Sequence, residues 1–166
     1  MPPGVKVCML RLKLLCRSLC LMRVYSLNSS AHTVIPGGNY ALRRFKTNES
    51  TILLGDFNAH VANDALVWKS VISQHGDADI NDNGRLLLQL CCNNALCIMN
   101  TFFQHRDLLK HTWCWDALDQ WSLTDFCIVS ADLSQSVLDV RVSLGRLCPF
   151  KACRWHDRAF WSYVQP

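Results

Sequence analysis

The chain has 166 residues, half of them hydrophobic, and its mean hydropathy is +0.07. This composition excludes a disordered protein and fits one buried core. The formal net charge of +4 is compatible with a polyanionic partner without requiring one, and no apolar run is long enough to cross a membrane.

The N-terminal segment predicts an antiparallel hairpin of two strands, over residues 5–15 and 18–25. Toward its end, the first strand alternates apolar and basic side chains, which is the period-two pattern of a strand. No acidic residue precedes Glu49, so this hairpin is basic. A polar loop follows over residues 26–39, and residues 40–46 can form one or two helical turns.

The next strand carries the strongest chemical signal in the chain. Residues 51–54 form an apolar run that ends at Gly55, and Asp56 and Asn58 follow two residues apart. In an extended segment, side chains at this spacing face the same way. A carboxylate and a carboxamide presented together suit a divalent metal, an activated water or a phosphate oxygen. An ordinary turn rich in Asp and Asn is the competing interpretation.

The middle of the chain predicts one clear helix. A weak helical pattern over residues 65–71 lies in a long loop, and a stronger one over residues 85–93 has apolar residues at helical spacing. Asp82 or Asn83 is the expected N-cap, and Asn94 is the expected C-terminal stop.

Strands predominate after the helix. We expect one over residues 96–100, a pair formed by residues 111–115 and 123–130, and a last one over residues 137–144. With a βαβ step over residues 51–100, the fold class is mixed α/β. After position 145 the pattern loses any clean period. We therefore expect a partial domain over residues 1–145 and an unrelated tail over residues 146–166, whose composition allows disorder.

Ten cysteines raise the question of metal or disulfide chemistry. There is no C-x-x-C pair, and many of the cysteines fall in helix-like or strand-like apolar runs, namely Cys91, Cys92, Cys97, Cys114 and Cys127. Without a secretory signal, we expect buried reduced thiols in an intracellular protein, nuclear or cytoplasmic and not secreted. A small zinc protein using Cys148, Cys153 and His156 is a weaker alternative, because their spacing is poor.

Several short motifs, spaced over residues 5–144, together resemble the endonuclease/exonuclease/phosphatase superfamily. The resemblance is strongest to the endonuclease domains of LINE-type retrotransposons and the craniofacial development protein two-like sequences derived from them. The motifs are Val24-Tyr25-Ser26-Leu27-Asn28, Leu54-Gly55-Asp56-Phe57-Asn58-Ala59-His60, Asn83-Gly84-Arg85-Leu86-Leu87, Met99-Asn100-Thr101-Phe102-Phe103, His111-Thr112-Trp113 and Leu123-Thr124-Asp125-Phe126.

The resemblance implies an endonuclease/exonuclease/phosphatase-type α/β sandwich with mixed sheets. A complete one would need roughly 200–250 residues, so we expect an incomplete domain. It also implies hydrolysis of a phosphodiester in DNA by in-line attack of water, with Mg²⁺ or Mn²⁺ in intact relatives. Such chemistry needs a metal carboxylate, a group that activates water, donors for the developing charge, and a histidine.

Site roles follow from the resemblance, residue by residue. Asp56 would activate or orient the water, and Asp56 and Asn58 would hold metal or phosphate. Tyr25 and Asn28 match a Tyr-x-Pro-Asn segment that reaches the scissile phosphate. Leu27 replaces the proline and removes its fixed φ, which makes the loop geometry less assured.

Three further positions complete the expected site. Asp125 matches the aspartate that orients the catalytic histidine, although Thr124 stands where an aliphatic residue is usual. Thr112 and Trp113 match a segment that supports the site and meets nucleic acid. A core role is the stronger alternative for Trp113, and a half-buried strand position is an equal one for Tyr25.

Two absences decide the functional prediction. The family's metal-binding glutamate lies upstream of the tyrosine segment, whereas the single glutamate here, Glu49, lies downstream of Tyr25. Glu49 is about 23 Å of extended strand away from Asp56, too far to share a metal. The closing Ser-Asp-His, expected after Val142, is also missing. Losing both the glutamate and the histidine argues against metal binding here.

The leading prediction is therefore a degenerate fragment of a divalent-metal-dependent endonuclease domain of retrotransposon type, without catalytic activity. The alternative is a non-catalytic nucleic-acid-binding module that uses the basic N-terminal strands.

Overall fold

The computed structural model describes residues 5–13, 18–26, 49–115, 120–144 and 158–164. The loop and helical turns expected before position 49, together with Leu27 and Asn28, lie outside them. So do Cys148, Cys153 and His156 of the alternative zinc site. Among the described elements, no helix has both the length and the apolar character needed to cross a membrane.

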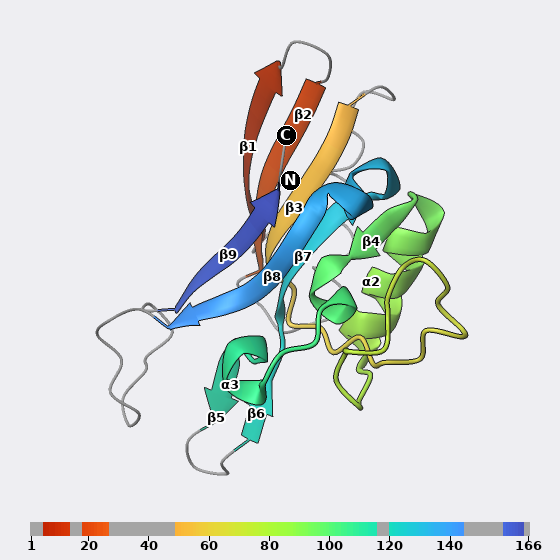
Figure 1. Ribbon diagram of the computed structural model, residues 1–166, viewed down its shortest axis with the longest axis vertical. Helices are drawn as coiled ribbons and strands as arrows, with labels where there is room; N and C mark the ends of the chain where they lie inside the picture. The colour runs from red at the N-terminus through yellow and green to blue at the C-terminus, as the bar shows by residue number, and fades with distance from the viewer. Residues whose placement is uncertain (1–4, 14–17, 27–48, 116–119, 145–157, 165–166) are drawn as a thin grey trace.

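A five-stranded sheet in the order β1-β2-β3-β7-β4 forms the centre of the molecule (Figure 1). Only the β2–β3 pair is parallel, so the sheet is mixed. Its strands are β1 (Val5–Lys13), β2 (Ser18–Ser26), β3 (Glu49–Asp56), β4 (Leu96–Ile98) and β7 (Asp125–Ser130). The fold class expected from the sequence, mixed α/β, is confirmed.

Further elements lie around this sheet. Two antiparallel pairs of strands lie outside it, β5 with β6 and β8 with β9. The remaining elements are α2 (Asp82–Asn93), α3 (Asp107–Lys110), β5 (Trp113–Trp115), β6 (Gln120–Ser122), β8 (Val137–Leu144), β9 (Arg158–Val164) and the 3₁₀ helices η1 (Met99–Phe102) and η2 (Ala131–Ser136).

The two faces of the central sheet carry separate apolar clusters, because strand side chains alternate between faces. On one face, Met22, Leu53 and Ile128 are aligned by the strand register and pack with Leu87 and Leu88 of α2.

On the other face, Ile52 and Val129 are register partners and pack with Val137 and Val140 of β8. Helix α2 and strand β8 thus cover opposite faces of the sheet, and the core is a layered sandwich (Figure 1).

Helix α2 begins one turn earlier than its apolar pattern indicates. Its N-cap is Asn81, whose extended backbone lets the side chain accept a hydrogen bond from the Gly84 amide at 2.7 Å. The expected caps Asp82 and Asn83 are wrong, since both lie inside the helix. The C-terminal stop is confirmed at Asn94, whose amide donates to the Cys91 carbonyl.

The strand pairing expected between residues 111–115 and 123–130 is wrong. Strand β5 pairs with β6, while β7 lies between β3 and β4. Residues 126–129 are all buried, so both faces of β7 are covered, as in a central strand. Strand β7 begins two residues later than predicted, after Leu123 and Thr124, whose amides donate to side chains from other segments.

The weak helical pattern over residues 65–71 corresponds to hydrogen-bonded turns. The Trp68 amide donates to the Asp64 carbonyl at 3.1 Å, but Ser70 adopts a left-handed backbone with φ of 66°. Leu66 is 82% exposed and Val67 is 67% exposed. Only Trp68 and Val71 of this segment pack into the core, so too few apolar side chains share one buried face to stabilise a helix.

The C-terminal segment, residues 146–166, contains a strand that the sequence did not predict. Strand β9 (Arg158–Val164) pairs antiparallel with β8. Its aromatic residues Phe160, Trp161 and Tyr163 favour extended structure. This propensity was not recognised because the segment lacks a regular alternation of apolar and polar residues. The division of the chain near residue 145 stays a prediction.

Five cysteines with described side chains support the expected role as small apolar residues. Four are buried, and none of the five forms a disulfide, namely Cys20, Cys91, Cys92, Cys97 and Cys127, with Cys92 the exposed one. Burial raises the thiol pKa of both Cys91 and Cys97. Such thiols are protonated and inert at neutral pH.

Candidate active site

Three adjacent strands bring the main expected site positions to one end of the central sheet. The parallel register of β2 and β3 sets Tyr25 beside Asp56, and the antiparallel register of β3 and β7 sets Asp56 beside Asp125. The carboxyl ends of β2 and β3 therefore meet the start of β7. Positions far apart in the sequence become neighbours because each lies at the same level of the sheet.

Asp56 is nearly buried, at 9% exposure. Its Oδ1 accepts the Asn58 amide at 2.8 Å, and the Thr124 side chain hydrogen-bonds to the same carboxylate. Burial raises the pKa of Asp56, and these two hydrogen bonds only partly oppose that effect. The carboxylate is thus held in one orientation by its own loop and by the chain entering β7.

Asp125 lies beside Asp56 and has the more strongly raised pKa. Burial and the nearby charge of Asp56 raise it to about 6, against a hydrogen bond from Thr112 and the positive charge of Arg23. Two carboxylates that repel each other in a partly buried site titrate as a coupled pair. Perturbed groups of this kind are typical of functional sites.

Asn58 adopts a left-handed backbone, with φ of 48°. Asparagine tolerates this conformation better than most residues. The Asn58 carbonyl accepts hydrogen bonds from Nδ2 of Asn81 at 3.2 Å and Nδ2 of Asn83 at 2.9 Å. Two amide side chains from the start of α2 thereby fix the turn that follows Asp56.

Asn81 hydrogen-bonds to three backbone groups, two in the loop after Asp56 and one in α2, and the sequence did not predict this role. Besides contacting Asn58, its Oδ1 accepts the amides of His60 at 3.1 Å and Gly84 at 2.7 Å. Gly84 packs directly on the His60 carbonyl, because a Cβ at this position would lie 1.8 Å from that oxygen. The pair of asparagines before this glycine was a possible signal, since asparagines next to a loop with a left-handed residue commonly act as its hydrogen-bonding partners.

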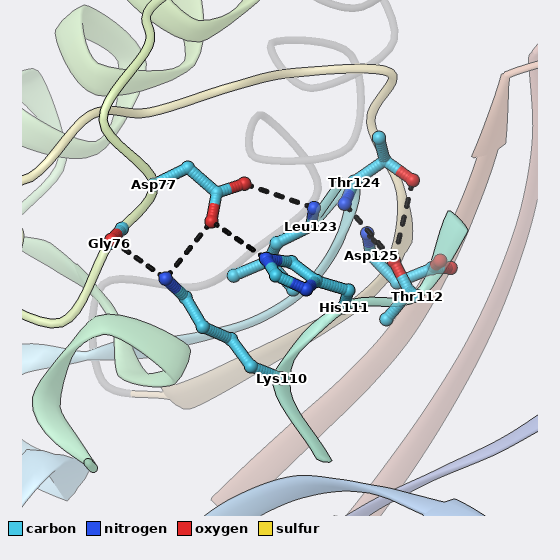
Figure 2. A network of polar contacts seen from close by, with 8 residues as sticks. All are labelled: Gly76, Asp77, Lys110, His111, Thr112, Leu123, Thr124 and Asp125. Atoms are coloured by element: carbon cyan, nitrogen blue, oxygen red, sulfur yellow. Dashed lines mark hydrogen bonds and ion pairs between the residues drawn. The ribbon is translucent and has the colours of Figure 1, made fainter. Parts of the chain in front are cut away.

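Thr112 supports Asp125 from below (Figure 2). Its Oγ1 accepts the amides of Thr124 at 3.0 Å and Asp125 at 3.1 Å. The expected supporting contribution of Thr112 therefore has a geometric basis, while contact with nucleic acid stays a prediction. Trp113 begins β5 opposite Ser122 and is partly buried, outside the central sheet.

Asn100 is a second supporting residue that was not assigned a role. It is 7% exposed, its Nδ2 donates to the Asp125 carbonyl at 3.2 Å, and its Oδ1 accepts the Cys127 amide at 2.8 Å. These bonds connect η1, which directly follows β4, to the backbone of β7. The motif at residues 99–103 included Asn100, but its hydrogen bonds to the backbone of β7 could not be predicted. A buried side-chain amide that bonds to backbone leaves no periodic pattern in the sequence.

Glu49 lies at the opposite end of β3 from Asp56. The two residues also lie on opposite faces of the sheet, because side chains alternate along a strand. Glu49 is on the face of Leu53, which packs toward α2. Asp56 is on the face of Ile52, which packs toward β8. Distance and direction both separate the two carboxylates. Across the described ranges, no three His, Cys, Asp or Glu side chains form a group that could hold a metal ion.

The fold is similar to that of a solved endonuclease. The endonuclease domain of TRAS1, a telomere-specific non-LTR retrotransposon, matches with a TM-score of 0.55 at 15% sequence identity. The match covers 84% of this chain and 57% of that domain, so the chain spans little more than half of the neighbour's length. No protein-family model matches the sequence, and no curated protein does. The similarity shows an endonuclease-type α/β fold.

Proposed function

We propose that this chain is an endonuclease-like domain of retrotransposon type that retains part of a phosphodiester-cleaving site and does not hydrolyse DNA. The observation that carries the proposal is the placement of Asp56 beside Asp125 at the end of the central sheet, with Glu49 at the far end and on the other face. The pair matches the water-activating and histidine-orienting aspartates of the resembled family. The carboxylate that would complete its metal site is not near them.

The remaining chemistry is incomplete in a second respect. The family mechanism needs a histidine beside the reacting phosphate, and Asp125 would orient it. Two histidines of the described residues are engaged elsewhere, since His105 Nε2 lies 2.7 Å from Asp139 and His111 Nε2 lies 3.5 Å from Asp77. General acid–base catalysis is typically worth about 10²–10⁴-fold, so its loss alone would suppress turnover strongly.

The residues present do not fit a tightly bound Mg²⁺ or Mn²⁺ ion. Asp56 and Asp125 offer carboxylates, but Oδ1 of Asp56 already accepts the Asn58 amide. Across the described ranges no third acidic or histidine side chain joins the pair, and Mg²⁺ held by one or two carboxylates ordinarily depends on substrate phosphates to complete its ligands. We derive no catalytic step through such an ion in this chain.

A plasmid-nicking assay tests the proposal. The purified chain is incubated with supercoiled plasmid in Mg²⁺ and, separately, in Mn²⁺, beside the Asp56→Ala variant made in the same way. We expect equal and negligible nicking by both proteins. Nicking by the parent chain that disappears in Asp56→Ala would overturn the assignment of an inactive site, because a contaminating nuclease would act in both samples.

A non-catalytic nucleic-acid-binding module is the second candidate. Arg23 is exposed on β2, two residues before Tyr25, and the chain carries a net charge of +4. Phosphate contacts release counterions, so affinity for DNA should fall steeply between about 50 and 200 mM salt. Binding of labelled duplex DNA is compared for the parent chain and Arg23→Gln. An affinity that does not change with salt would exclude this candidate.

A further inference from the structure

Three consecutive backbone amides at the entry to β7 donate to side chains from distant segments. The Leu123 amide donates to Oδ2 of Asp77 at 3.0 Å. The next two amides, of Thr124 and Asp125, both donate to Oγ1 of Thr112, at 3.0 and 3.1 Å. Figure 2 shows the two acceptors approaching this stretch from neighbouring segments. The backbone that carries the Asp125 side chain is therefore fixed before the strand ladder begins.

Water cannot easily replace these acceptors. Leu123 is 1% exposed and Thr124 is 8% exposed. A buried amide without an acceptor is costly, so the conformation of residues 123–125 depends on the presence of Asp77 and Thr112.

Asp77 is itself held by two neighbouring residues that lead directly into Thr112. Its Oδ1 lies 3.0 Å from Lys110 Nζ and 3.5 Å from His111 Nε2. The same Lys110 ammonium donates to the Gly76 carbonyl at 2.8 Å. The side chains of Asp77, Lys110 and His111 are between 14% and 18% exposed, so the contacts are largely shielded from solvent.

The charge state of Asp77 suits an anchoring role. Burial alone would raise the pKa of Asp77, but hydrogen bonds from His111, Leu123 and Lys110, together with the charge of Lys110, lower it to about 2. The group is therefore a carboxylate at any physiological pH. It can accept the Leu123 amide and hold Lys110 at the same time.

We infer that Asp77 is a positioning residue that fixes Asp125 beside Asp56, by anchoring Leu123 directly and Thr112 through Lys110 and His111. This inference rests on the proposed function only in treating the Asp56–Asp125 pair as the site. Asp77 would not touch substrate. A single carboxylate connects the loop before α2 with both chain segments that meet under Asp125, so its loss should loosen the pair locally.

The test is amide hydrogen exchange measured by NMR on the whole chain, without DNA or metal. The variants are Asp77→Ala, Asp77→Asn, which keeps an oxygen acceptor but loses the charge, and the control Asp79→Asn, an exposed residue of the same loop. In Asp77→Ala we expect the amides of Leu123, Thr124 and Asp125 to exchange at least tenfold faster relative to Ile128. The side-chain carboxyl ¹³C signal of Asp125 should shift as well.

The graded series separates positioning from general stability. Asp77→Asn should give an intermediate effect, and Asp79→Asn should give none. If Asp77→Ala does not fold, Asp77→Asn carries the test with the same expected local pattern. Equal acceleration of the Leu123, Asp125 and Ile128 amides, with an unchanged Asp125 carboxyl signal, would overturn the inference. Because no cleavage is measured, this outcome is independent of the nicking assay.

Discussion

Two partly buried acidic centres of this protein have opposite electrostatics. Asp77 is surrounded by Lys110, His111 and a backbone amide, and its pKa is lowered to about 2. Asp125 lies beside another carboxylate, Asp56, and its pKa is raised to about 6. Both centres are close to the same short stretch of backbone, residues 123–125.

The comparison distinguishes a carboxylate whose charge is paired within the fold from one whose charge is repelled by a neighbouring carboxylate. The charge of Asp77 is neutralised within the fold, so the centre is complete without a ligand. Burial and the charge of Asp56 disfavour the charged form of Asp125, and Thr112 and Arg23 only partly oppose them, so this centre is not neutralised in the same way.

The largest effects should come from two tightly packed glycines, Gly76 next to Asp77 and Gly84 in the first turn of α2. A Cβ on Gly84 would lie 1.8 Å from the His60 carbonyl, and one on Gly76 would lie 1.8 Å from the Ala62 carbonyl. Because backbone must move in both cases, Gly84→Ala and Gly76→Ala should each destabilise the fold by about 3 kcal/mol. Urea unfolding measures the loss. Gln89→Ala, at an exposed position of α2, should change stability by less than about 0.5 kcal/mol.

The two aspartate centres should respond oppositely to the same substitution. At pH 7.5, Asp77→Asn removes a favourably paired charge and should destabilise by about 2 kcal/mol. Asp125→Asn removes an unfavourably buried charge and should stabilise by about 2 kcal/mol. Urea unfolding of both variants measures the sign. Destabilisation by Asp125→Asn would contradict the view that its charge is uncompensated.

The stability of the parent chain should depend on pH in two separate windows. The folded-state pKa of Asp125 is raised to about 6, so its contribution is fully present below its ordinary value of 3.8 and is lost as pH rises through about 6. The pKa of Asp77 is lowered, so its contribution is present above 3.8 and is lost as pH falls through about 2.

Unfolding midpoints from pH 2 to pH 8 check both windows. Stability should decline by about 2 kcal/mol from pH 4 to pH 7, and Asp125→Asn should flatten that limb while leaving the acidic limb unchanged. A limb between pH 4 and pH 7 that persists in Asp125→Asn would assign it to another group.

The smallest effect is expected from divalent cations. With two carboxylates and no third acidic or histidine ligand in the described residues, 1 mM Mg²⁺ or Mn²⁺ should raise stability by less than about 0.3 kcal/mol at pH 7.5. Thermal unfolding with and without the ion, in the parent chain and in Asp56→Ala, measures the difference. A larger increase that depends on Asp56 would show that the carboxylate pair still binds a cation.

The sequence predicted those parts of the fold that have a local signature. Strand β8 has the predicted bounds, and the N-terminal hairpin and helix α2 are present, because alternation and helical periodicity reveal such elements. The GDFN motif and the motif containing Asp125 marked two positions that the structure sets side by side. The functional roles of these residues stay predictions.

The remaining features depend on contacts between distant polar residues. The side-chain amides of Asn81 and Asn100 satisfy backbone groups in other segments, and the cluster of Asp77, Lys110 and His111 joins positions more than thirty residues apart. Such contacts leave no periodic pattern. The pairing of β5 with β6 was not predicted, for a related reason. The break between β6 and β7 lies at Leu123 and Thr124, and the acceptors of their amides, on Asp77 and Thr112, are not identified by the sequence.

The alternation along β3 has a consequence for protein engineering. A third acidic ligand for the Asp56–Asp125 pair cannot be gained by moving or remodelling Glu49, whose side of the strand faces α2. Leu54 is the nearest position of β3 with the correct parity, about 7 Å along the strand from Asp56, and it is only partly buried. Reconstructing a cation site by design would therefore start with Leu54→Glu.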